Sequence, residues 1–412
     1  MLLFQMSELI KISLVLFLIL FLLRKKLNIG YVLLIASSAL FVLYGMNVAG
    51  ITATLKRTLA SSVTINLLLA LSLIRILELI LREKNILSAM MSAAKILFKK
   101  RRAIIISMPM LIGMLPSLGG AYFSAPMVKE ATSGINMSQE EKAFINYWFR
   151  HPWEFILPLY PGVLLASAVS NIPLYNLIKA NMVYAVLLLA TGFLFAMRGI
   201  RGDPHKAKAE QAEENKSPNR ILKEDLASFL PIVTVLSLVV IFHMELHFAL
   251  LAIIAPLFVL HKYRAADILR VTRHGFALEV IVMIFGVMLF KETMETSGAV
   301  SNLSRFFIQQ KVPFIPIICI LPFMTGMMTG LTVGFVSSTF PLLISMSGGA
   351  SLALISLAFA AGFIGVLLSP VHLCLVLTKE YFKADLWGIY KRILPASAVI
   401  FIAAIIEYTI LR

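Results

Sequence analysis

Charged residues are scarce in this sequence. Only 14% of its 412 residues are Asp, Glu, Lys or Arg, while 59% are hydrophobic, and soluble proteins carry about 25% charged residues. Stretches of roughly 20 apolar residues, enough for a helix to cross a hydrocarbon core of about 30 Å, recur along the chain. This composition excludes a soluble globular enzyme and predicts an all-α polytopic membrane protein.

Cysteines are few, and the motifs of common enzyme classes are missing. Cys319 and Cys374 both lie inside apolar segments, so no disulfide framework is expected. The sequence has no GxxxxGK[ST] phosphate-binding loop and no HExxH zinc motif. We therefore expect a protein that is not an enzyme and has no resident cofactor.

Hydropathy predicts ten membrane helices in two sets of five. A polar stretch at 199–222, rich in Lys, Glu, Asn and Pro, separates the sets and has the composition of a flexible linker. The chain is thus divided into a first half at 1–198, this linker and a second half at 223–412. The predicted helices lie at about 8–23, 29–46, 60–82, 139–167, 173–198, 226–243, 246–262, 276–297, 350–378 and 388–411.

The two halves carry the same features in the same order. Each has an apolar stretch broken at its middle by small residues, at about 103–135 and 312–346. Such a stretch is typical of a re-entrant hairpin, whose unpaired backbone a membrane tolerates only inside protein or beside water. Each half also has a long helix interrupted by proline, at Pro152 or Pro370. Because five crossings is an odd number, the pattern predicts two inverted repeats of five helices.

The formal net charge of +16 would suit nucleic-acid binding in a soluble chain. Here most Lys and Arg residues fall on alternate loops, which is typical of cytoplasmic loops. The distribution predicts external N- and C-termini, a cytoplasmic linker, a first hairpin open to the cytoplasm and a second open to the outside. We therefore expect a multi-pass protein of the cell membrane whose partner is the lipid bilayer, and no nucleic-acid partner.

Paired hairpins facing proline-broken helices resemble the ion-transporter superfamily, which includes divalent-anion/sodium symporters, citrate and gluconate permeases, and sodium/proton antiporters. Within it, the helix count and the segments LPSLGGAYFSAP (115–126) and LLSPVHLCLVLT (367–378) are similar to an uncharacterised permease family known as a domain of unknown function. The resemblance implies an elevator motion and a homodimer. Those symporters carry a Ser-Asn-Thr motif at each hairpin tip. Neither tip here contains asparagine, so a dicarboxylate substrate and a two-sodium stoichiometry do not carry over.

Small and hydroxylated residues at the two hairpin tips are candidates for substrate binding. Glycine lets backbone approach a ligand closely, and hydroxyls add hydrogen bonds. The alternative is that these residues only allow close helix packing. The candidates are Ser117, Gly119 and Gly120 in the first hairpin, and Thr329, Gly330, Thr332 and Ser338 in the second.

Ionisable residues lie at both proline breaks. Glu154 and His372 each follow the breaking proline by two residues, and ionisable groups within membrane spans usually mark ion or proton paths. We assign Glu154 and His151 to coupling of an ion or proton, and His372 and Arg150 to substrate binding. The alternatives are that Glu154 pairs with Arg150 at i, i+4 and that His372 hydrogen-bonds a free carbonyl.

Together these features predict a secondary active transporter of a small anionic, carboxylate-type solute, coupled to Na⁺ or H⁺. One alternative is an intramembrane enzyme that uses His151, Glu154 and His372. Another is a channel or exporter on the same scaffold.

Overall fold

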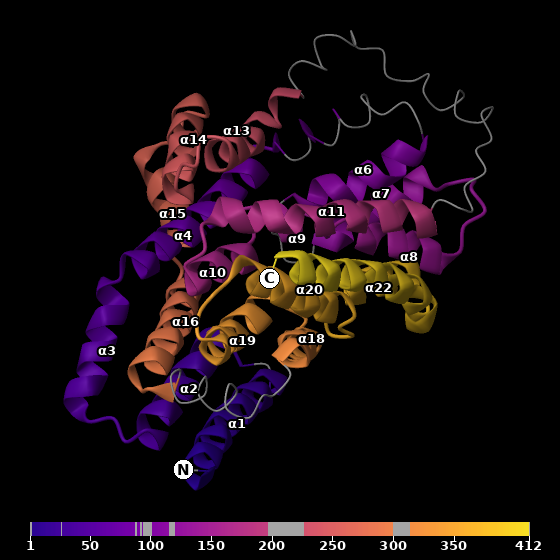
Figure 1. Cartoon of the computed structure of the whole chain (residues 1–412). Coiled ribbons are helices and arrows are strands. Elements are labelled where there is room, and N and C mark those ends of the chain that lie inside the picture. The colour runs from indigo at the N-terminus through magenta and orange to yellow at the C-terminus, as the bar shows by residue number, and fades with distance from the viewer. Residues whose placement is uncertain are drawn as a thin grey trace.

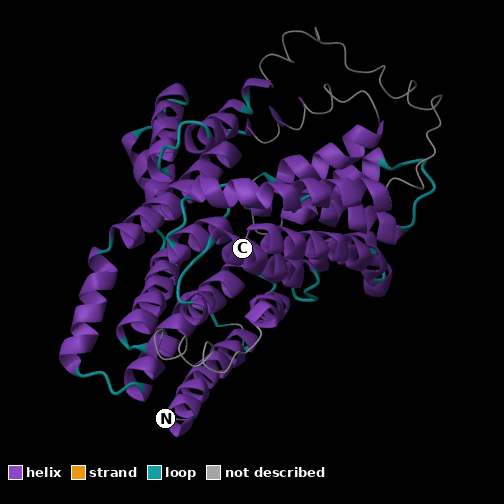
Figure 2. Cartoon of the chain, viewed as in Figure 1, coloured by secondary structure: helices purple, strands orange, loops and turns teal. Residues whose placement is uncertain are grey.

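The computed structural model describes residues 2–25, 27–86, 89–90, 93, 101–114, 120–196, 226–299 and 314–411, and these form helices, turns and loops with no strand among them. The all-α prediction is therefore confirmed for the described part of the chain (Figure 2). The predicted linker at 199–222 and the centre of the first hairpin at 115–119 lie outside the described residues.

Within the described ranges, five helical segments are long and apolar enough to cross a membrane, which agrees with a multi-pass membrane protein. The other five predicted crossings are present as shorter apolar helices. The shortest, α13, has 11 residues and is about 16 Å long. The five long segments are Ser62–Glu83, Gln139–Ser170, Leu174–Ala196, Ala265–Thr296 and Leu386–Leu411.

The helices form two groups that lie beside each other (Figure 1). In the first group α2 packs against α16 and α14 packs against α4. The backbones of α2 and α16 touch, because a Cβ added at Gly286 would run into the carbonyl of Gly30. This group consists of α1 (Leu2–Arg24), α2 (Ile29–Leu43), α3 (Val48–Ala60), α4 (Ser62–Glu83), α13 (Leu230–Val240), α14 (Leu246–Leu260), α15 (Ala265–Gly275) and α16 (Leu278–Thr296).

The second group holds the hairpins and the interrupted helices. Its most extensive contact is between α18 and α20, where a Cβ at Gly326 would run into the carbonyl of Gly362, and a Cβ at Gly365 into the carbonyl of Phe323. The group consists of α6 (Arg101–Gly113), α7 (Gly120–Ala131), α8 (Gln139–Trp148), α9 (Trp153–Ile156), α10 (Pro161–Ser170), α11 (Leu174–Ala196), α18 (Phe314–Thr329), α19 (Thr332–Ser347), α20 (Leu352–Leu367), α21 (Leu373–Phe382) and α22 (Leu386–Leu411).

The hydropathy pattern did not predict α3 and α15, which lie where it placed connecting loops. Neither helix is a long apolar run, and hydropathy over a membrane-length window detects only such runs. Asn47 starts α3 by accepting a hydrogen bond from the backbone N–H of Gly50 at 2.8 Å. Arg270 ties α15 to the end of α4 through two hydrogen bonds of 2.5 and 3.0 Å to the carboxylate of Glu83.

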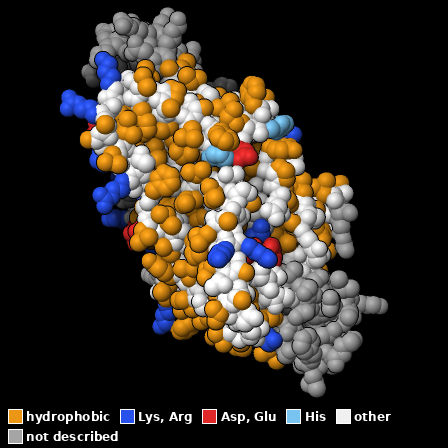
Figure 3. Space-filling view, turned by 90° about the vertical axis from the view of Figure 1, so that its left-hand side faces the viewer, with side chains coloured by type: hydrophobic (Ala, Val, Ile, Leu, Met, Phe, Trp, Pro, Cys, Tyr) orange, Lys and Arg blue, Asp and Glu red, His pale blue; other side chains and the backbone are white. Residues whose placement is uncertain are grey.

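Hydrophobic side chains are spread over the described part of the face in Figure 3, where charged side chains occur only in small scattered groups. On α14, Phe248 is 57% exposed and Val259 is 79% exposed. A soluble monomer rarely exposes a contiguous apolar surface of this extent, whereas lipid acyl chains cover such a surface without cost. The exposed surface therefore agrees with the composition in indicating a membrane protein.

Candidate functional site

The first interrupted helix is divided into α8, α9 and α10. A capping box starts it, in which Ser138 Oγ accepts from the backbone N–H of Glu141 and the Glu141 carboxylate accepts from the N–H of Ser138. The helix ends at Trp148, and His151 and Pro152 lie in the turn before the single-turn helix α9. Since proline has no backbone N–H to donate, the turn cannot continue the α8 ladder. The predicted break is confirmed.

The second interrupted helix is divided into α20 and α21. Ser351 caps its start by accepting from the backbone N–H of Leu354 at 3.2 Å. The break falls between Leu367 and Leu373 and contains Ser369 and Pro370, so that His372 is the N-cap residue of α21. The predicted position of this break is also confirmed.

Each interrupted helix packs against a hairpin helix from the other half of the chain. α10 of the first half lies against α19 of the second, and α21 of the second half lies against α7 of the first. At the α10–α19 contact a Cβ on Gly162 would lie 2.7 Å from the Cβ of Thr332. This crossed packing brings both breaks and the tip of the second hairpin to one place.

The two break histidines meet in the interior. His151 Nε2 lies 3.1 Å from His372 Nε2, and the side chains are 0% and 7% exposed. Each ring also uses its Nδ1: that of His151 bonds the carbonyl of Tyr147 at 2.6 Å, and that of His372 bonds the carbonyl of Gly330 at 2.6 Å. The alternative expected for His372, a hydrogen bond to a free carbonyl, therefore describes its Nδ1 but not its Nε2.

Glu154 joins the same cluster and links it to the second hairpin. Its Oε2 accepts a hydrogen bond from Thr332 Oγ1 at 3.1 Å, and its Oε1 lies 3.7 Å from His151 Nε2. Thr332 is the first residue of α19, where the partial positive charge of a helix N-terminus favours a carboxylate. The partners described for Glu154 are thus His151 and Thr332.

The other predicted site residues are placed less centrally. Ser338 is fully buried and donates to the carbonyl of Gly334 in its own helix at 2.6 Å, while Thr329 donates to the carbonyl of Thr325 at 2.8 Å. Arg150 lies at the first break and is 3% exposed.

In the first hairpin, Ser117 and Gly119 lie outside the described residues, and Gly120 is the first residue of α7. The structure therefore brings together His151, Glu154, Gly330, Thr332 and His372 of the predicted set.

Gly330 is the hairpin-tip residue whose substitution the geometry opposes most directly. Its φ is +64°, and a Cβ would lie 2.9 Å from both the Cα and the backbone nitrogen of His372. We expect Gly330→Ala to displace the tip from His372 and to reduce any activity of the site more than tenfold. The matched control is Gly50→Ala, where the nearest atom to a Cβ is a side-chain oxygen of Asn47 at 3.2 Å. Equal activity of the two variants would contradict a role for the tip.

Cys374 is a neighbour of the histidine pair to which the sequence pattern assigned no role. A ligating atom of Cys374, His151 and His372 each lies within 4.8 Å of the others. Such donors also occur in transition-metal sites. Because the ring centroids are 5.2 Å apart and each nitrogen lies on the rim of its ring, a nitrogen separation of 3.1 Å means that the rings meet head to head. A separation of 3.1 Å is that of a direct N–H···N hydrogen bond, and two nitrogens bound to one tetrahedral ion lie at a similar separation.

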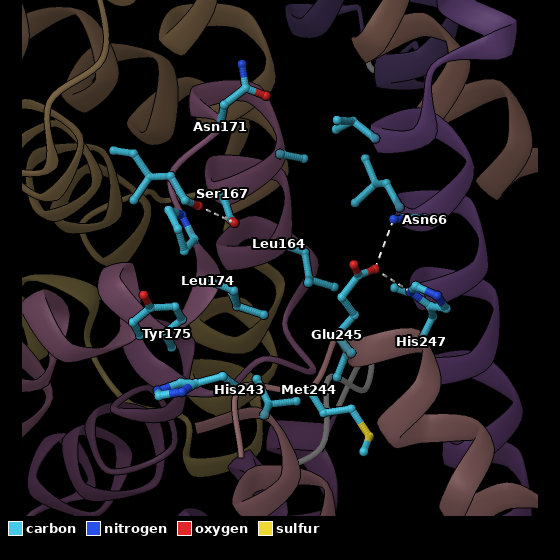
Figure 4. A pocket seen from close by; sticks show the side chains of 18 residues that line it. Asn66, Leu164, Ser167, Asn171, Leu174, Tyr175, His243, Met244, Glu245 and His247 are labelled. Carbon is cyan, nitrogen blue, oxygen red and sulfur yellow. Dashed lines mark hydrogen bonds and ion pairs between the residues drawn. The ribbon is translucent and has the colours of Figure 1, made fainter. Parts of the chain in front are cut away.

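A cavity of about 420 Å³ lies between the two helix groups, and none of its 18 lining residues is a predicted site residue (Figure 4). On one wall Glu245 accepts a hydrogen bond from Asn66 at 3.0 Å and lies 3.5 Å from Nδ1 of His247. Leu164 of α10 lines the opposite wall. The sequence did contain a signal for this cavity, since a His-x-Glu-x-His pattern interrupts an apolar region at 243–247.

A second buried cluster of polar side chains links three helices through hydrogen bonds. Asn146 Nδ2 donates to the carbonyl of Ala121 at 3.0 Å and to Thr378 Oγ1 at 2.9 Å, while its Oδ1 accepts from Ser124 Oγ at 2.7 Å. These bonds give both amide hydrogens and the amide oxygen a partner and join α7, α8 and α21. They hold the two interrupted helices at a fixed distance, which positions the histidines.

Fold and site define an all-helical protein suited to a membrane, with buried ionisable groups where two interrupted helices meet a hairpin tip. The chain belongs to the family described as "Protein of unknown function (DUF401)", which matches residues 6–411. This confirms the uncharacterised family expected from the sequence. No curated protein matches the chain.

Proposed function

We propose that this protein is a secondary active transporter of a small anionic, carboxylate-type solute, coupled to Na⁺ or H⁺. The observation that carries the proposal is the buried meeting of His151, His372, Glu154 and Thr332, contributed by two interrupted helices and a hairpin tip. Discontinuous helices that meet in the interior are the general form of a transporter binding site. Buried ionisable groups between apolar helices usually serve ion or proton paths.

We further propose that the two halves are inverted repeats and that the chain is related to the ion-transporter superfamily. The crossed packing of α10 on α19 and of α7 on α21 supports this, because a two-fold relation between halves would produce such reciprocal contacts. In this proposal the group with the hairpins slides as an elevator against the group formed by α1–α4 and α13–α16. The cavity between α4 and α10 lies on the boundary along which that motion would occur.

We propose that the protein has the membrane orientation predicted by the distribution of Lys and Arg over its loops. The protein would lie in the cell membrane with external termini, a cytoplasmic linker and hairpins that open to opposite sides, and it would form a homodimer. With external termini, the cavity beside Asn66 and Glu245 would lie toward the outside. We propose it as the vestibule from which a solute approaches the breaks, because Leu164 lines it and Gly162, two residues earlier on α10, contacts Thr332.

Transport is tested with purified protein in proteoliposomes. A panel of labelled monocarboxylates, sugar acids, amino acids and inorganic oxyanions is offered under an inward gradient of either Na⁺ or H⁺. We expect gradient-dependent accumulation of at least one anion, which collapses when an ionophore dissipates the gradient. Passive anion conductance without accumulation would support a channel instead, and chemical conversion without flux would support an enzyme. Either result contradicts the proposal.

A further inference from the structure

The hydrogen-bond roles of the two break histidines leave two acceptor nitrogens facing each other. A carbonyl oxygen only accepts, so the Nδ1 atoms that bond the carbonyls of Tyr147 and Gly330 must both carry protons. A neutral imidazole has one proton, and a ring protonated at Nδ1 presents a bare lone pair at Nε2. Two neutral rings would therefore oppose two lone pairs across the 3.1 Å between the Nε2 atoms. One additional proton on the pair removes this conflict.

We infer that His151 and His372 share one proton, that this proton is the coupling ion of the transport cycle, and that its loss releases the tip of the second hairpin. The coupling role of this proton rests on the proposed function, whereas the proton site and its link to the hairpin rest on geometry alone. In the protonated pair one Nε2–H donates to the other Nε2, and all four ring nitrogens are satisfied.

The surroundings can accommodate a positive charge on the pair. Glu154 Oε1 lies 3.7 Å from the Nε2 of His151, and the ring of Tyr147 lies 4.5 Å from that of His151 and 5.7 Å from that of His372, measured between centroids. Both rings are buried, so a carboxylate at this distance is screened little by solvent. Among the residues that the structure describes, Cys374 and Glu154 act directly on His372, and Tyr147, Arg150, Tyr160 and Tyr390 are the further titratable and charged groups around them.

The link to the hairpin runs through His372. Its Nδ1–H bonds the carbonyl of Gly330, the tip residue whose backbone is in the left-handed region with a φ of +64°. When the proton leaves, repulsion between the two Nε2 lone pairs forces one ring away from its position. If His372 moves, the contact with Gly330 breaks and the tip separates from the second break. Protonation thus favours a closed tip, and the stabilisation is present at low pH and lost as pH rises.

Hydrogen–deuterium exchange of the whole protein in lipid nanodiscs tests the link. Tip amides at 326–334, whose bonds include Gly330 N–H to the carbonyl of Gly326, are followed between about pH 5 and 9, with rates corrected for intrinsic exchange; free imidazole titrates near pH 6.5. Between the midpoint of the pair with the tip open and its higher midpoint with the tip closed, we expect tip protection to fall by up to about tenfold per pH unit, as linkage to one proton requires. Peptides from α11 should keep constant protection.

His151→Gln is the diagnostic variant, because a glutamine amide can donate to His372 Nε2 without an added proton. The variant should keep the tip protected at all pH values tested, and the control His274→Gln, on α15 in the other helix group, should behave as wild type. Wild-type protection that does not change with pH would overturn the inference even if His151→Gln does not fold. One equivalent of bound transition metal in wild type, lost in His151→Gln, would also overturn it by showing a metal between the rings.

The outcomes separate this inference from the transport proposal. Anion accumulation driven by Na⁺, with a tip insensitive to pH, would refute the shared coupling proton and leave transport standing. A tip that opens with pH in a protein that accumulates no anion would refute transport and the coupling role, while retaining the proton-linked hairpin.

Discussion

Glu154→Gln is expected to abolish gradient-driven uptake while leaving the fold intact. Glutamine has the size of glutamate and can still accept from Thr332 Oγ1, but it removes the negative charge that lies 3.7 Å from His151 Nε2. A hydrogen bond to a charged group contributes about 1.5–3 kcal/mol against about 1 kcal/mol for a neutral one, and the ion pair with His151 is lost as well, so we expect uptake to fall about tenfold or more. The measurement is the initial rate of uptake in proteoliposomes under the gradient that drives the wild type.

The matched control for this variant is Glu292→Gln. Glu292 is a carboxylate of similar setting, with a side chain 25% exposed and a partner, Arg57, at 3.9 Å, but it lies on α16 in the other helix group. Its replacement should leave uptake within about twofold of wild type, since exposed ion pairs contribute about 0–1 kcal/mol. If the two variants lose uptake equally, or if Glu154→Gln transports normally, the role assigned to Glu154 is wrong.

The second large effect is expected at the contact between α18 and α20. Gly326→Ala and Gly365→Ala each place a methyl group where the backbone of the opposing helix lies, because a Cβ at these positions runs into the carbonyls of Gly362 and Phe323. Backbone cannot rotate away as a side chain can, so the helices must separate. Overpacking of this kind costs about 1–3 kcal/mol. We expect a lower Tm in detergent for each variant, followed by thermal-shift fluorescence.

The glycine variants should also alter the site, since α18 leads into the Gly330 tip and α20 leads into the break before His372. Gly50→Ala serves as control because its added methyl meets only side-chain atoms, the Asn47 cap oxygen at 3.2 Å and Met46 at 3.6 Å, and no backbone. It should be neutral or slightly stabilising, as alanine favours a helix over glycine by about 1 kcal/mol. A Tm for Gly326→Ala equal to that of Gly50→Ala would show that α18 and α20 tolerate separation.

Local chemistry made most helices and both breaks predictable. Apolar runs of membrane length identified segments such as Leu174–Ala196 and Leu386–Leu411, and Pro152 and Pro370 marked the breaks because proline cannot donate the ladder hydrogen bond. α3 and α15 were missed because they are held by a cap and by an ion pair, which leave no hydropathy signal. Helices such as α13 proved shorter than predicted, because hydropathy does not mark where hydrogen bonding ends.

The candidate site was predictable in its residue types and only partly in its partners. Glu154 and His372 were singled out because ionisable residues in apolar helices are costly. Their partners were not deducible: Glu154 accepts a hydrogen bond from Thr332 on a distant helix, and the polar wall of the cavity at Asn66, Glu245 and His247 was overlooked. An i, i+4 spacing makes a pair geometrically available, but a competing partner from a distant helix is invisible in the sequence.

By itself, therefore, the sequence determined a membrane-type, all-α chain with a hairpin tip at Gly330 and ionisable groups at two proline breaks. These features depend on hydrophobicity, on missing backbone donors and on small residues, all of which act over a few neighbouring positions. Only the tertiary structure decided that His151 meets His372, 221 residues away. That contact results from the crossed packing of hairpin helices on interrupted helices, in which backbones can approach only at particular small residues. The same packing turned two separate histidines into a pair, for which we propose a shared proton.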